Sequence, residues 1–183
     1  MESDLESLLS QIHHKSHNIA LDFDGVIAEN PIDISIKVFE TFDRLLGKYD
    51  LVGRIIYRPL YEILSLNGRK PNKELINTLN GRPVYILTTN SEYVREIVYK
   101  YAKNAGLEVK EVYALPPGKR EREKKYEWIN KKLQELKPVI HITDDPEVIK
   151  QAEEPEIKVI LYSWNGQNSS TNNPKIGYFK YLI

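Results

Sequence analysis

The sequence predicts an α/β protein in which a parallel sheet is covered by helices on both faces. Five short apolar runs have the length of buried strands, at residues 18–21, 84–87, 109–114, 139–142 and 157–162. Helical periodicity fills the segments between the last four, and strands that alternate with helices indicate βαβ units. Strands buried on both faces of a parallel sheet read as continuous apolar runs, as these do.

The interval between the first two predicted strands is unusually long. It covers about 60 residues, whereas one crossover helix needs far fewer. We expect the excess, residues 30–80, to form a small helical insertion, with helix-like stretches at 36–46 and 51–64. Residues 1–29 and 81–183 then form the core domain.

Later segments carry the signals of individual helices. One apolar face comprises Val94, Ile97, Val98 and Tyr101, and Gly106 is placed to end that helix. A second face comprises Ile129, Leu133 and Leu136, and is stopped by Pro138. Residues 176–183 are expected to add an edge strand.

Composition excludes several classes of protein. The chain of 183 residues has 41% hydrophobic and 28% charged residues, which is typical of a globular protein rather than a disordered one. It has no cysteine, which excludes disulfides and thiolate chemistry. Its 26 basic and 26 acidic residues cancel, so no net charge attracts nucleic acid or an anionic membrane. Acidic residues stand where a signal peptide would be basic, and we therefore expect a cytoplasmic protein.

Polar residues gather at the ends of the predicted strands. Asp22 and Asp24 follow the first strand, Thr88 follows the second, and Asp144 and Asp145 follow the fourth. The carboxyl ends of parallel strands meet at one edge of the sheet, where ligands bind. Carboxylates brought together repel one another unless a cation lies between them, and all-oxygen ligands favour Mg²⁺.

Each strand-end acid also has a purely structural interpretation. An Asp after a strand commonly satisfies the backbone of a turn. Asp145 precedes Pro146 and would be a good N-cap with proline at the first helical position. The occurrence of both acidic pairs in chain order, each at a strand end, favours the functional interpretation.

Three strand endings together resemble the motifs of a known family. They are similar to motifs of the haloacid-dehalogenase-like (HAD-like) phosphohydrolase superfamily. The three are the apolar strand ending in Asp-x-Asp-Gly at residues 19–26, the strand ending in Thr88, and the strand ending in paired acids at 140–145. The resemblance covers residues 18–162. It implies a Rossmann-like three-layer α/β/α core with a cap inserted after the first strand, which here is the helical segment 30–80.

The resemblance also implies catalytic roles. Asp22 would be the nucleophile that forms an aspartyl-phosphate, and Asp24 would protonate the leaving alcohol and then activate water. Thr88, or Thr89 if the strand ends one residue later, would hydrogen-bond a phosphoryl oxygen. Lys125 would neutralise charge on the phosphoryl group, with Lys124 and Lys119 as alternatives for that lysine.

The implied cofactor is Mg²⁺ alone. The resemblance assigns it to Asp22, to Asp24 through its backbone carbonyl, to Asp145 as a direct ligand and to the neighbouring Asp144. An acid at position 24 favours a phosphatase or phosphomutase over other branches of the superfamily.

The sequence therefore predicts a Mg²⁺-dependent phosphomonoesterase that acts on a small phosphorylated metabolite. Arginines and tyrosines of the insertion suit a nucleotide or sugar phosphate, although packing of the insertion onto the core is the favoured interpretation of Tyr57 and Tyr61, which are four residues apart. The alternatives are a phosphomutase or other phosphotransferase, and a non-catalytic phosphate-binding module on the same fold. We expect a small-molecule partner rather than nucleic acid or membrane, and the sequence carries no signal for an oligomeric state.

Overall fold

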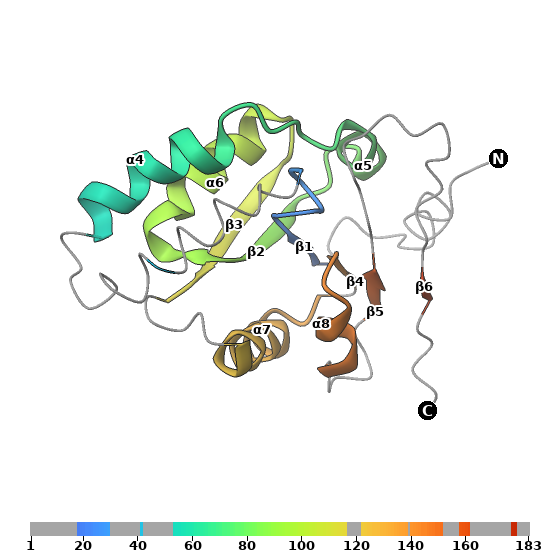
Figure 1. Ribbon diagram of the computed structural model, residues 1–183. Helices are drawn as coiled ribbons and strands as arrows, with labels where there is room; N and C mark the ends of the chain where they lie inside the picture. The colour runs from blue at the N-terminus through green and yellow to red at the C-terminus, as the bar shows by residue number, and fades with distance from the viewer. Residues whose placement is uncertain are drawn as a thin grey trace.

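The computed structural model describes residues 18–29, 41, 53–116, 122–138, 140–151, 158–161 and 177–178 (Figure 1). Its strands are β1 (Ile19–Asp22), β2 (Val84–Ser91), β3 (Val109–Leu115), β4 (Ile140–Thr143), β5 (Lys158–Leu161) and β6 (Gly177–Tyr178). Its helical elements are η1 (Gly53–Tyr57), α4 (Arg58–Leu60), η2 (Tyr61–Leu66), α5 (Lys73–Leu79), η3 (Glu92–Val94), α6 (Arg95–Asn104), α7 (Arg122–Leu136) and α8 (Pro146–Gln151).

The strands form one sheet in the order β3-β2-β1-β4-β5-β6. Strands β1 to β5 pair in parallel, and β6 joins β5 in the antiparallel direction, with Tyr178 opposite Ile160. The predicted parallel α/β fold is confirmed, and β6 confirms the edge strand over two residues of the predicted range. The chain reverses its direction of winding between β1 and β4, and this switch point is where open α/β sheets bind ligands.

The two faces of the sheet are buried against different helices (Figure 1). On one face, Ile19, Leu21 and Ile86 share a core with residues of α5 and α6, among them Leu75 and Val98. On the other face, Ala20 of β1 packs with apolar side chains of α7 and α8; this second core contains Leu87, Leu115, Trp128, Ile129, Leu133 and Val148. The three-layer arrangement follows from the alternation of side chains along β1.

A tight turn carries the chain away from β1. The carbonyl of Phe23 accepts hydrogen bonds from the amides of Ile27 and Ala28, both at 3.0 Å. Gly25 has φ +71°, a conformation that other residues adopt at a cost. Buried Asn72 holds this turn from the side, because its Nδ2 donates to the carbonyl of Val26 at 3.1 Å and its Oδ1 caps α5 by accepting from Leu75 N.

Helix α6 ends as the sequence predicts. Gly106 has φ +104°, and its amide donates to the carbonyl of Lys103 at 3.0 Å. The next amide, of Leu107, donates to the carbonyl of Ala102 at 3.1 Å. This pair of bonds is the Schellman motif, in which glycine takes the left-handed position.

Part of the predicted insertion is visible as the continuous helical run η1-α4-η2. Tyr57 and Tyr61 are buried in the same core as β1, so they pack this run onto the sheet. Helix α5, at the end of the predicted insertion, places Leu75, Ile76 and Leu79 in that core as well. The predicted helix at 36–46, apart from residue 41, and the acidic N-terminal segment lie outside the described residues, and the boundary at residues 30 and 80 stays a prediction. Among the described helices, none combines the length and apolar character needed to cross a bilayer.

Candidate functional site

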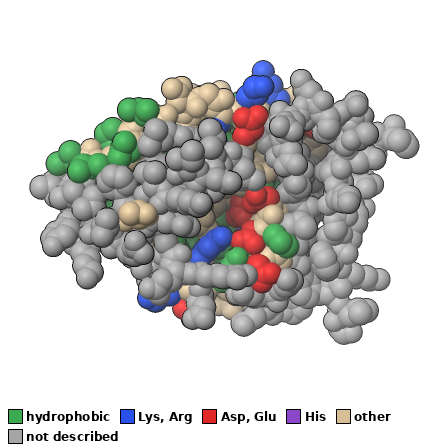
Figure 2. All heavy atoms as spheres, in the orientation of Figure 1, with side chains coloured by type: hydrophobic (Ala, Val, Ile, Leu, Met, Phe, Trp, Pro, Cys, Tyr) green, Lys and Arg blue, Asp and Glu red, His purple; other side chains and the backbone are tan. Residues whose placement is uncertain are grey.

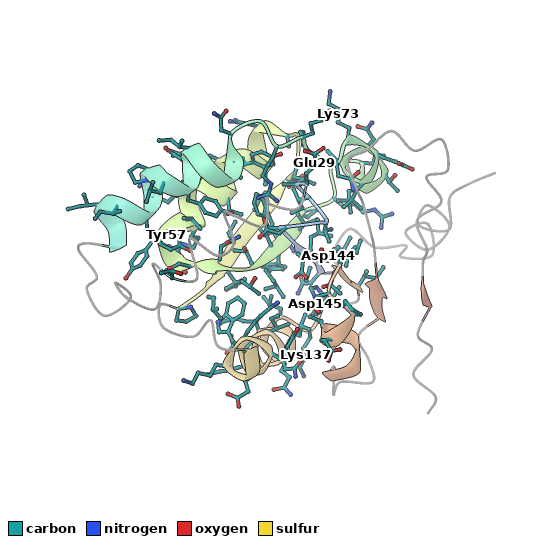
Figure 3. The ribbon with its side chains drawn as sticks, in the orientation of Figure 1. Glu29, Tyr57, Lys73, Lys137, Asp144 and Asp145 are labelled. Atoms are coloured by element: carbon teal, nitrogen blue, oxygen red, sulfur yellow. The ribbon has the colours of Figure 1, made fainter. Side chains whose placement is uncertain are left out.

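The candidate site lies at the carboxyl ends of β1, β2 and β4, on both sides of the switch point. Figure 2 shows acidic side chains gathered in the middle of the visible face, next to a basic one. Figure 3 places Asp144 and Asp145 side by side where β4 leads into α8. Five of the predicted site residues belong to two groups linked by hydrogen bonds and ion pairs. We call them the Asp22 cluster (Asp22, Lys125, Tyr126, Thr143, Asp145) and the Asp24 network (Asp24, Tyr61, Arg69, Thr88, Asn90).

Asp22 ends β1 and is oriented by its neighbour strand. The hydroxyl of Thr143, at the end of β4, donates a hydrogen bond to Asp22 Oδ2. Thr143 Oγ1 in turn accepts from the amide of Asp145 at 3.1 Å, which fixes the direction of the hydroxyl. Asp22 Oδ1 lies 3.6 Å from Nε2 of His141. The Asp22 side chain, 17% exposed, therefore has one oxygen held and the other facing a buried ring.

Burial raises the pKa of Asp22 to about 8. The Thr143 hydrogen bond lowers this pKa, the charge of Asp144 raises it, Lys125 lowers it and Asp145 raises it. Burial also lowers the pKa of His141 to about 4, so the ring is neutral at physiological pH and does not offset the charge of Asp22. An acid held in this way favours a positive partner, because a nearby cation relieves both the desolvation and the repulsion.

Asp145 is the most heavily bonded acid of the site. Its Oδ2 accepts from Lys125 Nζ and from the Tyr126 hydroxyl, both at 2.9 Å. Its Oδ1 accepts from the amide of Glu147 at 3.0 Å and so caps α8, as the N-cap interpretation predicts. The structural role of Asp145 is thus observed, and it ties α7 to the start of α8.

The Lys125–Asp145 pair is held in the ionised state. Burial alone would lower the pKa of Lys125, but the hydrogen bond to Asp145, together with the charges of Asp145, Tyr126 and Asp22, leaves it raised. Burial would likewise raise the pKa of Asp145, yet Lys125 and the other donors leave it lowered. Of the three candidate lysines, the structure places Lys125 in this cluster. Lys124 is exposed, and Lys119 lies outside the described residues.

Asp24 belongs to the second group. Its Oδ1 lies 2.7 Å from Nη2 of Arg69, and its Oδ2 accepts from Asn90 Nδ2 at 2.6 Å. Asn90 Nδ2 also lies 2.9 Å from the Tyr61 hydroxyl and 3.0 Å from Thr88 Oγ1. Asp24 is therefore connected both to β2 and to the helical run that precedes α5.

An irregularity in β2 makes these contacts possible. We expected the apolar run to end at Leu87 and the strand to end at Thr88 or Thr89, but the strand continues to Ser91. Thr88 pairs with Ala114 and Ser91 pairs with the next residue of β3, so Thr89 and Asn90 are extra residues that bulge from the ladder. The bulge lets Asn90 turn back toward Thr88, whose Oγ1 also accepts from the Asn90 amide at 3.2 Å. Thr88 is buried within the Asp24 network, whereas Thr89 is half-buried.

The donor chemistry fits a hard cation such as Mg²⁺. Within the described part of the chain, no group of three or more His, Cys, Asp or Glu side chains is arranged to hold a metal ion. Protein Mg²⁺ sites commonly use only one or two carboxylates, completed by water and substrate phosphate. Asp22 and Asp144 suit that description, because each charge is unfavourable for the other. Asp24 Oδ2, Asp22 Oδ2 and both oxygens of Asp145 accept hydrogen bonds, and the assignment of metal ligands stays a prediction.

Several residues of the site carry no sequence signal. Arg69 stands in a connecting segment far from every motif, and Tyr126 reads as an apolar helix residue. Asn90 is visible at a strand end, but the bulge that aims it is not. Thr143 and His141 alternate with Ile140 and Ile142, so they could have been assigned to the face of Ala20 from the pairing of β1 with β4.

Comparison with known proteins gives structural neighbours only. No family model matches the chain, and no curated protein matches it. A solved haloacid dehalogenase-like hydrolase from Streptococcus pneumoniae is 19% identical with a TM-score of 0.46, over 79% of this chain and 83% of that one. A HAD-superfamily hydrolase of subfamily IA from Geobacter sulfurreducens is 14% identical with a TM-score of 0.41, over 79% of this chain and 86% of that one. A HAD family enzyme from Bacteroides thetaiotaomicron, solved with magnesium and inorganic phosphate, is 16% identical with a TM-score of 0.40, over 84% of this chain and 97% of that one. All three neighbours carry the name of the superfamily that the sequence motifs resemble.

Proposed function

We propose that this chain is a Mg²⁺-dependent phosphomonoesterase of the HAD-like type that acts on a small phosphorylated metabolite. The observation that carries the proposal is Asp22. It is a buried carboxylate at the end of the central strand, at the switch point, held by Thr143 and surrounded by the charges of Lys125, Asp144 and Asp145. A carboxylate in this position suits nucleophilic attack on phosphorus.

The first step transfers the phosphoryl group to the protein. A carboxylate oxygen of Asp22 attacks phosphorus while the bond from phosphorus to the leaving oxygen breaks. Asp24 gives its proton to that oxygen, so the product leaves as a neutral alcohol. Lys125 lies within the same cluster and favours the negative charge on the transferred group.

The second step returns the protein to its starting state. Asp24, now ionised, takes a proton from water, and the oxygen of that water attacks the phosphorus of the aspartyl-phosphate. The bond between phosphorus and Asp22 breaks, and inorganic phosphate leaves. Mg²⁺, held by Asp22 and Asp144, would supply charge compensation for the phosphate oxygens and keep Asp22 ionised.

The test is hydrolysis of p-nitrophenyl phosphate by the full chain, with Mg²⁺ and with chelator. We expect metal-dependent turnover that Asp22→Asn abolishes and that Glu74→Gln leaves unchanged. Glu74 is a suitable control because it is an exposed acid on α5, away from the strand ends. After acid quenching, mass spectrometry should find one phosphoryl group on the wild-type protein and none on Asp22→Asn. If no divalent cation supports turnover, the phosphatase proposal is contradicted. If the phosphoenzyme forms but breaks down only when a second alcohol is added, the protein is a phosphotransferase instead.

A further inference from the structure

Arg69 is a buried cation next to the proposed acid-base residue. Its side chain is 7% exposed, and Nη2 lies 2.7 Å from Asp24 Oδ1. The guanidinium also lies over the ring of Phe23, 5.4 Å from its centre, so it is placed between the acid and an aromatic face. Burying a guanidinium is costly unless it has a strong partner, and Asp24 is the acid that it contacts.

The backbone of Arg69 is fixed as firmly as its side chain. The hydroxyl of Tyr101, on α6, donates to the carbonyl of Arg69 at 3.1 Å. The ring of Tyr101 packs edge-on against Phe23, with the ring centres 5.5 Å apart. Arg69 is therefore held at both ends by residues that also shape the turn after β1, so its position relative to Asp24 is defined.

Arg69 is also incompletely satisfied. The nitrogens Nε, Nη1 and Nη2 of its buried guanidinium make no hydrogen bond in the described structure, so its contact with Asp24 Oδ1 is an ion pair without hydrogen-bond geometry. A buried donor without a partner costs free energy, so the burial of Arg69 is not explained by hydrogen bonding. Its charge lies against one oxygen of one carboxylate, that of Asp24.

The other oxygen of Asp24 is held from a different element. Asn90 donates to Oδ2 from the bulge in β2, and the same amide nitrogen lies within hydrogen-bond distance of the Tyr61 hydroxyl. Asp24 is thus contacted from two sides, by the ion pair with Arg69 from the segment that follows η2 and by the hydrogen bond from Asn90 of β2. Because each oxygen has its own contact, the two together restrict the orientation of the carboxylate.

We propose that Arg69 is a positioning residue for Asp24, and this inference rests on the phosphatase activity proposed above. Arg69 holds the carboxyl group in the orientation from which it gives a proton to the leaving oxygen. When that proton has moved, the positive charge of Arg69 stabilises the carboxylate that remains and keeps it ready to take a proton from water. No bond to Arg69 forms or breaks.

Leaving-group dependence tests this role. p-Nitrophenol leaves readily as an anion and needs little help from an acid, whereas an alkyl alcohol needs a proton. We expect Arg69→Met to lower kcat/KM for ethyl phosphate about 10- to 100-fold and for p-nitrophenyl phosphate less than about 5-fold, since general acid catalysis typically contributes a factor of at least 10². Arg69→Lys should restore part of the loss on ethyl phosphate. Arg95→Met is the matched control, because Arg95 is an exposed arginine paired with Glu92 on the surface. This variant should leave kcat/KM unchanged for both substrates.

A double variant checks that Arg69 acts through Asp24. The losses on ethyl phosphate should not add, so Asp24→Asn with Arg69→Met should be no slower than Asp24→Asn alone. Equal losses on both substrates, or losses that add in the double variant, overturn the positioning role. If Arg69→Met does not fold in thermal denaturation, Arg69→Lys provides the same comparison of the two leaving groups. If the wild type is active and the Arg69 variant loses equal activity on both substrates, only the positioning role of Arg69 is contradicted. If the wild type is inactive on both phosphates, the proposed phosphatase activity is contradicted, and this inference with it.

Discussion

Binding of Mg²⁺ at neutral pH should displace a proton from Asp22. Burial raises the pKa of this acid to about 8, because the desolvation exceeds the lowering by the Thr143 hydrogen bond and by Lys125, while the charges of Asp144 and Asp145 add smaller increases. His141, whose ring faces Oδ1 of Asp22, has a pKa lowered to about 4 and stays neutral across the range of interest. A metal ligand must be deprotonated, so binding and proton release are linked.

The size of the effect follows from the pKa. With a pKa of about 8, Asp22 is about 90% protonated at pH 7 and about 10% protonated at pH 9. Binding of Mg²⁺ should therefore release about 0.9 proton per site at pH 7 and about 0.1 at pH 9. The affinity should rise about tenfold per pH unit below pH 8 and level off above it.

Isothermal titration calorimetry with MgCl₂, repeated in buffers of different ionisation enthalpy, measures the number of protons released. Asp22→Asn cannot release this proton and is the control. A wild-type protein that binds Mg²⁺ with no proton release at pH 7 would refute the reasoning, because it would show that Asp22 is already ionised or is no ligand.

Three further predictions concern stability. With chelator present, the unfolding free energy of Asp22→Asn in urea should exceed that of the wild type by about 3–5 kcal/mol at pH 8.5 and equal it near pH 4. The reason is that, between pH 4 and pH 8, the wild-type Asp22 holds a proton when folded and releases it when unfolded, which destabilises the wild type as the pH rises. Tyr126→Phe should lower the unfolding free energy by about 1–2 kcal/mol through the lost hydrogen bond to Asp145, and a change within about 0.5 kcal/mol would contradict it. Asn72→Ala removes the cap of α5 and the bond to Val26, and should lower the unfolding free energy by about 2 kcal/mol, measured as a lower thermal midpoint. Asn77→Ala, on the exposed face of α5, should leave the midpoint nearly unchanged, and equal effects of the two variants would rule out the cap.

The fold was predictable because the apolar runs record burial directly. Each of the five runs corresponds to a strand, since a parallel strand covered on both faces needs apolar residues along its whole length. The end of α6 was predictable for a similar reason, because Gly106 satisfies a local backbone requirement. Helix α5 was not predicted as a separate helix, because its seven residues are too few to show a clear period. Its N-cap, Asn72, is also held by a contact with Val26 that is remote in sequence.

The site was predictable only in part. Asp22, Asp24, Thr88 and Asp145 were expected together from the strand ends, and Lys125 from the adjacent helix. The structure places all five at the same edge of the sheet, and their roles stay predictions. The sequence did not predict that they divide into two groups, because the division depends on the direction of each side chain at the strand ends. Nor did it predict Arg69, since a contact between residues 69 and 24 follows no local pattern.

The division into two groups has a physical cause in β1. Asp22 continues the alternation of Ala20 and faces the side of α7 and α8, where Lys125 and Thr143 are available. Phe23 packs into the opposite core, and the turn then directs Asp24 toward Arg69 and the bulge of β2. An acid surrounded by like charges is best suited to a cation and to attack on phosphorus, whereas an acid held by one hydrogen bond and one ion pair is best suited to exchanging a proton in a fixed direction. Two carboxylates separated by a single residue can therefore perform different chemistry because the sheet and the turn give them different neighbours.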